Sequence, residues 1–284
     1  MRLARLLTLA LFVSGCSDDR PLPHSIYVWQ QRTDSAVNTA VREAAPQIQT
    51  FYLHAANLNF GPNGPVESRF ESPWKAVRES NRPTGLVVRI PNALGGLGSN
   101  PAQSESFVAL SRSLLNAAQE AQVSVSEIQV DYDCPESKLA GYSRFIQQVK
   151  ARLNGIRIRF TALPAWLGHP EFATLARQAD GYVLQVHSLE LPRAGDPKVK
   201  LCDPVQANKA IAQASRLGVP FSLALPTYRC LVLFNEKGEK IRVISEGTAP
   251  NLAEAATVVP ALSDADEIAE LVRSLQSNRP RELQ

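Results

Sequence analysis

The sequence lacks several features that define common classes of protein. Beyond its first residues it has no uninterrupted apolar run of about 18 residues, so no transmembrane helix is expected. Its formal charge of +3 over 284 residues is nearly neutral, and a nucleic-acid partner is therefore not expected. No Cys-x-x-Cys or His-x-x-His spacing is present, which argues against a structural zinc site. We predict neither a metal nor a cofactor.

Cysteine is also scarce, with four residues in the whole chain. If Cys16 is used in export, as its context indicates, then Cys134, Cys202 and Cys230 remain. Three thiols cannot all pair with one another, so at least one stays free, and the sequence does not identify a disulfide. Cys134 stands beside two aspartates, whose negative charge is expected to raise its pKa and to disfavour the reactive thiolate.

The first 15 residues have the order of an export signal. Arginines stand near the start, residues 6–13 form a short apolar run, and small residues precede Cys16. This ending resembles the lipobox of bacterial lipoproteins, which implies cleavage before Cys16 and attachment of a diacylglyceryl group to its sulfur. In the sorting pattern of such lipoproteins, a serine such as Ser17 after the cysteine favours the outer membrane, facing the periplasm. The lipid on Cys16 makes a lipid bilayer a predicted partner. The alternative is an ordinary signal peptide, residues 1–15, with a chance cysteine.

Strand-like and helix-like segments alternate from residue 26 onward, which is typical of parallel β–α–β units. The predicted strands are residues 26–30, 49–58, 85–90, 128–133, 156–163, 182–188 and 220–225. The predicted helices are residues 34–45, 104–121, 138–154, 170–179, 203–217 and 264–276.

Seven such strands and a trailing helix predict an α/β fold, a (β/α)8 barrel of the TIM type that lacks its last strand in this chain. The eighth strand would begin at residues 279–284. An open barrel and a truncated chain both fit, and truncation is favoured because an unpaired sheet edge promotes aggregation. A doubly wound open sheet is the competing fold, but no Gly-x-Gly-x-x-Gly follows the first predicted strand.

The domain organisation is simple. Residues 16–25 comprise the lipidated cysteine and a polar, proline-containing tether. Residues 26–284 are expected to form a single domain. Apolar runs on either side of residues 235–238 predict a β-hairpin insertion near residues 230–246.

Residues 128–137, IQVDYDCPES, carry the strongest functional signal. Gln129, Asp131 and Asp133 alternate with apolar residues, so the three polar side chains share one face of a strand. Pro135 then ends the strand. Two carboxylates on one face repel each other, which predicts a raised pKa for one of them. Such pairs are common where a site must hold both a proton donor and an anion.

In a barrel of this type, functional residues gather at the carboxyl ends of the strands. Those ends are rich in aromatic, amide and charged residues here, including His54, Asn57 and Arg89. Aromatic rings suit the apolar faces of sugars, and amides and carboxylates suit their hydroxyl groups. The residues that we predict to bind a glycan are Trp29, Gln129, Trp166, Gln185, His187 and Tyr228.

Three longer motifs carry a resemblance to a known family. IQVDYDCP, RFTALPAWL and DGYVLQVHSLE resemble an uncharacterised bacterial family of exported barrel proteins with a domain of unknown function. The motifs lie within residues 127–190, and weaker similarity covers residues 26–284. The resemblance implies a further strand beyond Gln284 and implies no activity.

The segment EIQVDYDCP is also distantly similar to the fourth-strand signature of chitinase-like glycosidases. By position, Asp133 takes the place of the catalytic acid, and Asp131 and Gln129 take the two acidic places before it. The family has glutamate where Asp133 stands, so this acid is one methylene shorter. In the sixth strand, His187 takes the place of a tyrosine. The resemblance implies a barrel with an acidic cleft the size of a sugar.

Two functions from different classes follow. Glycoside hydrolysis needs one protonated acid and one group that stabilises an oxocarbenium-like centre. In the first hypothesis Asp133 is the general acid, Asp131 is its electrostatic partner, and Glu190 acts from across the mouth of the barrel. In the second, the protein is a non-catalytic envelope lipoprotein that binds a saccharide or a protein.

Two further interpretations remain open. Asp131 and Asp133 could form salt bridges with Arg89 or Arg159 in a purely structural polar layer. A metal-dependent hydrolase that uses Asp131, Asp133 and His187 is less favoured, because no histidine-rich spacing supports it.

Overall fold

The computed structural model describes residues 21–91, 93–187, 193–245, 252 and 255–284. The predicted signal peptide and Cys16 lie outside these residues. Among the described helices, none combines the length and the apolar character that crossing a membrane requires.

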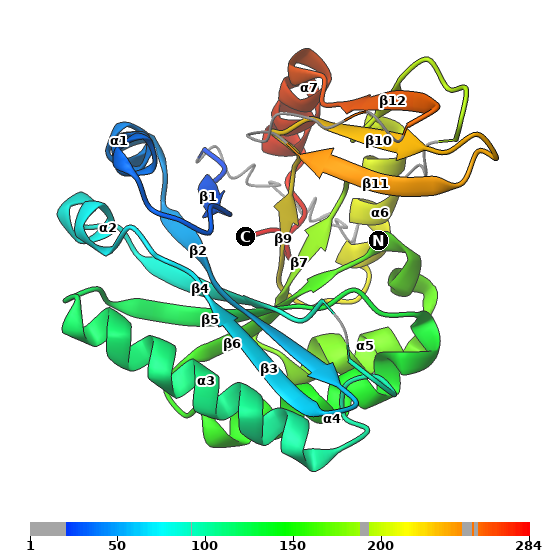
Figure 1. The fold of residues 1–284 in the computed structure, drawn as a ribbon. Coiled ribbons are helices and arrows are strands. Elements are labelled where there is room, and N and C mark those ends of the chain that lie inside the picture. Colours follow the sequence, from blue (N-terminus) through cyan, green and yellow to red (C-terminus); the bar gives the residue numbers. More distant parts are fainter. Residues whose placement is uncertain (1–20, 92, 188–192, 246–251, 253–254) are drawn as a thin grey trace, which may run out of the picture.

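The main sheet contains seven parallel strands that curl into part of a barrel (Figure 1). In spatial order they are β1 (Ser25–Val28), β2 (Thr50–Gly61), β4 (Thr84–Arg89), β5 (Val125–Asp131), β6 (Arg157–Ala162), β7 (Tyr182–Gln185) and β9 (Phe221–Ala224). A further strand, β3 (Gly64–Arg69), pairs antiparallel with β2. The prediction of a parallel α/β fold of the barrel type is confirmed.

The last residues of the chain extend this sheet beyond β9. The amide of Phe221 donates to the carbonyl of Glu282 at 2.9 Å, and the amide of Gln284 donates to the carbonyl of Phe221 at 2.9 Å. Phe221 and Leu283 form a parallel bridge. These residues therefore occupy the position that the sequence predicts for the start of an eighth strand.

Helices cover the outer, convex face of the sheet (Figure 1). They are α1 (Ser35–Ala44), α2 (Trp74–Ser80), α3 (Pro101–Glu120), α4 (Leu139–Arg152), α5 (Pro170–Gln178), α6 (Pro204–Ser215) and α7 (Ala265–Ser277). Short polar side chains start several of them. The carboxylate of Asp34 accepts from the amide of Val37 at 2.8 Å, and Asp203 caps α6 in the same way.

Aromatic residues from α4, α5 and the strands form the densest part of the core. The ring of Tyr142 on α4 meets Phe160 of β6 edge-on at 5.6 Å, and Phe172 of α5 meets Tyr182 of β7 at 5.3 Å. Such edge-to-face pairs add to the free energy gained by burying the rings. This packing holds α4 and α5 against β6 and β7, and the strand ladders place β5 beside β6.

A second sheet lies at one end of the barrel (Figure 1). Its strands, in spatial order, are β11 (Lys240–Ser245), β10 (Cys230–Phe234), β12 (Thr257–Leu262) and β8 (Val199–Lys200). The predicted hairpin is present as the antiparallel pair of β10 and β11. It is one half of a larger unit with its own buried apolar cluster, which includes Val232, Phe234 and Val259. The prediction of a hairpin was thus correct and incomplete.

Candidate functional site

On the inner face of the parallel sheet, side chains of paired residues on neighbouring strands lie next to one another. Arg89 of β4 stands opposite Asp131 of β5, at the carboxyl ends of both strands. The hydroxyl of Thr161 on β6 donates to Oδ1 of Asp131 at 2.7 Å, and Nε of Arg89 lies 3.6 Å from Oδ2. Both oxygens of this buried carboxylate therefore have a partner.

Asp133 lies two residues beyond Asp131, after the end of β5, and is exposed at the mouth of the barrel. Its pKa is raised, first because surrounding protein atoms displace part of its hydration shell, and second because of the negative charge on Asp131. The positive charge of Arg89 acts in the opposite direction. The prediction that one carboxyl of the pair has a raised pKa is confirmed.

A buried polar layer lies beneath this pair. The hydroxyl of Tyr27 donates to Oε1 of Gln129 at 2.6 Å, and Nε2 of Gln129 donates to Glu127 at 2.8 Å. Glu127 in turn lies 3.8 Å from the guanidinium of the buried Arg159. The prediction that Gln129 binds a glycan is wrong, because its side chain is fully buried and committed to these partners. It forms the floor of the site.

Close packing within the barrel holds Tyr52 over this layer. A Cβ atom added to Gly85 would lie 2.5 Å from the ring of Tyr52, which no real contact permits. Only glycine therefore fits at that position of β4. Burial raises the pKa of Tyr52 to about 12, and the charge on Glu127 acts in the same direction.

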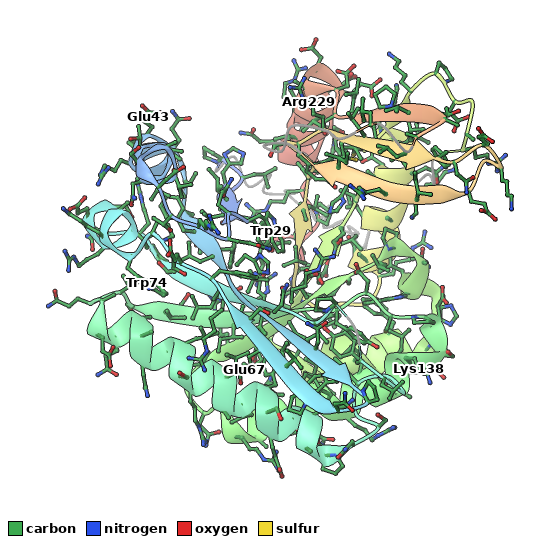
Figure 2. The ribbon with its side chains drawn as sticks, viewed as in Figure 1. Trp29, Glu43, Glu67, Trp74, Lys138 and Arg229 are labelled. Atoms are coloured by element: carbon green, nitrogen blue, oxygen red, sulfur yellow. The ribbon has the colours of Figure 1, made fainter. Side chains whose placement is uncertain are left out.

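Trp29 supplies an exposed aromatic surface just after β1, and Figure 2 shows it near the centre of the molecule. Its indole is stacked on Tyr27 at 5.7 Å and meets the ring of His54 at 4.7 Å. The residue is 41% exposed, so part of the indole is free to contact a ligand. Burial lowers the pKa of His54, whose Nε2 pairs with Oδ1 of Asn57 at 2.9 Å.

His187 and Tyr228 meet on the side of the site formed by β7 and β9. The hydroxyl of Tyr228 and Nδ1 of His187 lie 3.2 Å apart, with the rings edge-on. Burial lowers the pKa of His187, and the negative charge of Asp131 opposes that shift. Gln185 is half-buried at the end of β7. Gln185, His187 and Tyr228 are thus all at least partly exposed, and their roles in binding a glycan stay predictions.

Trp166 is buried in the core, and the prediction that it binds a glycan is wrong. Its side chain is 1% exposed and packs against Tyr142 and Phe172. Its indole Nε1 donates to the carbonyl of Cys134 at 3.1 Å. Since Cys134 follows Asp133, Trp166 instead anchors the segment that carries the candidate acid.

The remaining predictions for the site have mixed outcomes. Glu190 lies outside the described residues. Cys134, Cys202 and Cys230 are all buried and free of disulfides. Burial and the nearby Asp133 raise the pKa of Cys134 to about 12, as the sequence predicts. Across the part of the chain that the structure describes, no three His, Cys, Asp or Glu side chains are grouped to hold a metal ion.

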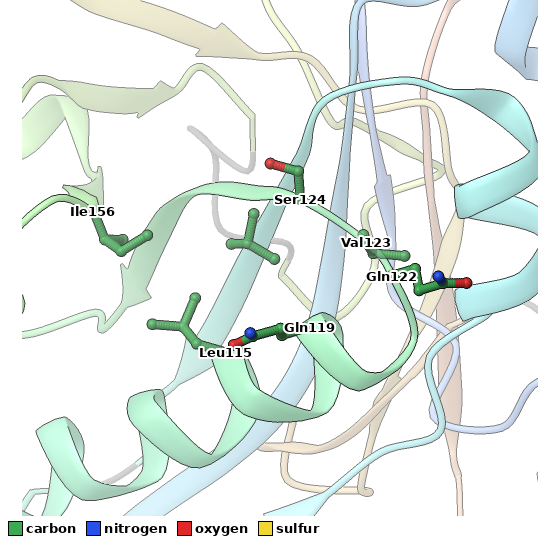
Figure 3. Close-up of a pocket in the computed structure, with 7 residues that line it drawn as sticks. Leu115, Gln119, Gln122, Val123, Ser124 and Ile156 are labelled. Atoms are coloured by element: carbon green, nitrogen blue, oxygen red, sulfur yellow. The ribbon is translucent and has the colours of Figure 1, made fainter.

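The molecule also has a shallow surface pocket that is far from this chemistry (Figure 3). It lies between α3 and the start of β5, at the amino ends of the strands, and Leu115, Val123 and Ile156 contribute to its apolar lining. None of its lining residues is ionisable. It therefore offers no catalytic group.

Three residues of the site were not among the predicted ligands, although the sequence contains signals for them. The sequence marks Arg89 as a polar residue at a strand end and as a candidate salt-bridge partner of the aspartates, and its Nε lies 3.6 Å from Asp131. Thr161 follows Arg157 and Arg159 with a period of two, which places it on the inner face of β6. Tyr27 shares a face with Trp29 by the same rule.

Residues 80–284 match the model of a domain of unknown function, DUF3142. The chain belongs to this family. No match was found among curated proteins.

Several solved structures have a similar fold. They include a chitinase from Bacteroides thetaiotaomicron (11% identity, TM-score 0.62), covering 93% of this chain and 88% of that one. The spore cortex-lytic enzyme SleL of Bacillus cereus is 13% identical, with a TM-score of 0.59, and covers 80% of this chain. The present chain spans only 56% of SleL. A GH18 chitinase from Cycas revoluta in complex with (GlcNAc)3 is 13% identical, with a TM-score of 0.51, and covers 88% of this chain and 80% of that one. At these identities the similarity establishes the fold alone, a glycoside-hydrolase-like barrel.

Proposed function

We propose that the protein binds and hydrolyses a glycan, with Asp133 as the general acid and Asp131 as its electrostatic partner. The observation that carries the proposal is the difference between these two carboxyl groups. Asp131 is held by Thr161 and Arg89, whereas Asp133 has no hydrogen-bond or ion-pair partner among the described residues and has a raised pKa. A proton donor beside a fixed carboxylate is the pair that glycoside cleavage requires.

The chemistry follows from that arrangement. Asp133 donates its proton to the glycosidic oxygen as the bond from that oxygen to the anomeric carbon breaks. The carboxylate of Asp131 lies close enough to raise the pKa of Asp133, and it favours the positive charge that develops at the anomeric carbon. Water then adds to that carbon, and the proton it releases restores Asp133. The exposed indole of Trp29 offers a stacking surface for a sugar ring.

The cellular setting is part of the proposal and rests on the sequence. Acylation of Cys16 would tether the domain to the outer membrane on its periplasmic side. Mass spectrometry of the mature protein tests this step. A diacylglyceryl adduct on an N-terminal Cys16 supports it, and an unmodified cysteine refutes it.

The experiment for catalysis is release of reducing sugar from a panel of envelope and storage glycans. Wild type is compared with Asp133→Asn, both starting at Ser17. Glu43→Gln is the matched control, because Glu43 is an exposed carboxylate on α1 and points away from Trp29 at the edge of the molecule (Figure 2). Activity lost in Asp133→Asn and kept in Glu43→Gln supports the proposal. If Asp133→Asn still hydrolyses the glycan, Asp133 is not the general acid.

Two features of the site favour a second function, which is glycan binding without hydrolysis. Arg89 already faces Asp131, and Asp133 is shorter than the glutamate of the similar glycosidases, so the site suits binding without turnover. In that case calorimetry detects glycan binding by wild type, and prolonged incubation yields no product. Asp133→Asn then changes affinity alone.

A further inference from the structure

Arg89 differs from the other arginines on the inner face of the sheet. Its side chain is 49% exposed at the carboxyl end of β4, and its Nε approaches Oδ2 of Asp131 only to 3.6 Å. Charge-assisted hydrogen bonds are typically about 2.7–2.9 Å. Within the described residues, its two terminal nitrogens have no hydrogen-bond partner. Because about half of the side chain is exposed, these donors are accessible from solvent.

Arg159 shows what a structural arginine looks like in the same sheet. It is buried two strands away, and its Nη2 donates to the carbonyl of Tyr182 at 2.8 Å and to the hydroxyl of Ser222 at 2.9 Å. A second group of its guanidinium faces Glu127. Arg159 is therefore immobilised by the protein, whereas Arg89 retains a donor edge for another partner.

The positive charge of Arg89 also acts on other ionisable groups of the site. It lowers the pKa of Asp133 and that of His54, which places it within electrostatic range of both groups. Asp131 occupies the Nε side of the guanidinium, so an incoming anion would meet the opposite edge. A planar guanidinium presents two parallel donors there, in the geometry that matches a carboxylate.

We infer that Arg89 binds a carboxylate group of the substrate, so that the glycan is an acidic one that contains uronic acid or another carboxylated sugar. This inference rests on the proposed function and names the substrate class for the same site. Repulsion between such a substrate and the cleft is limited, because Asp131 is countered by Arg89 and because the raised pKa of Asp133 favours its neutral form.

The test uses two probes of equal length, tetragalacturonate as the carboxylated glycan and chitotetraose as the neutral one. Binding of each is measured by calorimetry at low and at moderate salt for wild type, Arg89→Gln and Arg89→Lys. Arg69→Gln is the matched control, because Arg69 is equally exposed, at 49%, and pairs with Glu67 on β3. Circular dichroism and thermal melting confirm that each variant is folded.

Wild type is expected to bind tetragalacturonate at least about tenfold more tightly than chitotetraose, in a salt-sensitive manner. Arg89→Gln is expected to abolish this preference, and Arg89→Lys to keep only part of it, because lysine retains the charge without the two parallel donors. Arg69→Gln is expected to keep it in full.

Two outcomes separate the failure of this inference from the failure of the proposed function. If wild type binds chitotetraose as well as or better than tetragalacturonate, or if folded Arg89→Gln keeps the preference, the assignment of Arg89 is overturned and glycan binding stands. If wild type binds neither probe, nor any glycan of the hydrolysis panel, the proposed function falls and the inference falls with it.

Discussion

Replacement of Glu127 tests the buried layer beneath the candidate site. The side chain of Glu127 is 1% exposed and accepts a hydrogen bond from Gln129 at 2.8 Å. It faces two guanidinium groups, that of Arg157 at 3.1 Å and that of Arg159 at 3.8 Å. Arg157 is largely exposed, whereas Arg159 is buried. Glu127→Gln therefore leaves the charge of Arg159 inside the barrel without its counterion.

Removing one partner of a buried ion pair typically costs about 3–5 kcal/mol of unfolding free energy. Arg159 keeps its hydrogen bonds to Tyr182 and Ser222, which compensate part of the loss. We therefore expect Glu127→Gln to lie near the lower end, at about 3 kcal/mol. For a domain of this size, that corresponds to a fall in Tm of about 6–12 °C.

Urea unfolding followed by tryptophan fluorescence measures this difference. Glu67→Gln is the control, because Glu67 pairs with Arg69 at 3.0 Å on the surface and such pairs contribute about 0–1 kcal/mol. The double variant with Arg159→Met is expected to be less destabilised than the two single variants predict together, since both charges are then absent. If Glu127→Gln is no more destabilising than Glu67→Gln, the charges are not paired in a dry interior and the reasoning is refuted.

Three further predictions concern the site and its thiols. The pKa of Asp133 is higher in the folded protein than its ordinary value, so the stability of wild type falls as pH rises through that folded pKa. Asp133→Asn is therefore expected to be more stable than wild type at pH 7 and to lose this advantage below about pH 4, which urea unfolding measures. Arg89→Gln is expected to raise the pKa of Asp133 further, since the positive charge that lowers it is removed, and carboxyl-selective NMR titration measures the shift. A chain that starts at Ser17 is expected to show no thiol labelling at pH 8 while folded and three labelled cysteines, among them Cys134, in urea, whereas rapid labelling of the folded protein would contradict their burial.

The sequence predicts the parallel sheet because each strand and helix has a clear local period. The alternation of Gln129, Asp131 and Asp133 with apolar residues correctly places polar groups inside the barrel. The alternation does not determine how deeply each of these side chains is buried in the barrel. Gln129 is covered by side chains from β1, which is about a hundred residues away in the chain. A local sequence pattern cannot predict burial by so distant a segment.

Elements without a period were missed. The strand β8 has two residues and the helix α2 has seven, which is too short for a recognisable pattern. The strand β3 had a usable signal, because Asn63–Gly64 is a typical turn dipeptide between two extended segments. Trp166 was misplaced for a different reason: a tryptophan after a strand can face the cleft or the core, and tertiary packing decides which.

The difference between Asp131 and Asp133 arises from the place where the strand stops, and Trp166 helps to hold that place. Asp131 is the last residue of β5, so neighbouring strands supply its partners. Asp133 stands past that end and has none of those contacts. Its position depends on the next residue, Cys134, whose carbonyl accepts from the buried indole of Trp166.

Loss of that hydrogen bond should therefore alter the acid as well as stability. Trp166→Phe removes the donor while retaining an aromatic ring, and is expected to lower unfolding free energy by about 1–3 kcal/mol, because the carbonyl of Cys134 loses its partner. Partial loss of hydration is the largest cause of the raised pKa of Asp133, and a freed segment would let more water reach this carboxyl group. Its pKa is therefore expected to move back toward its ordinary value. NMR titration of Asp133 in folded Trp166→Phe measures this. An unchanged pKa in a destabilised variant would show that Trp166 supports the core without positioning the acid.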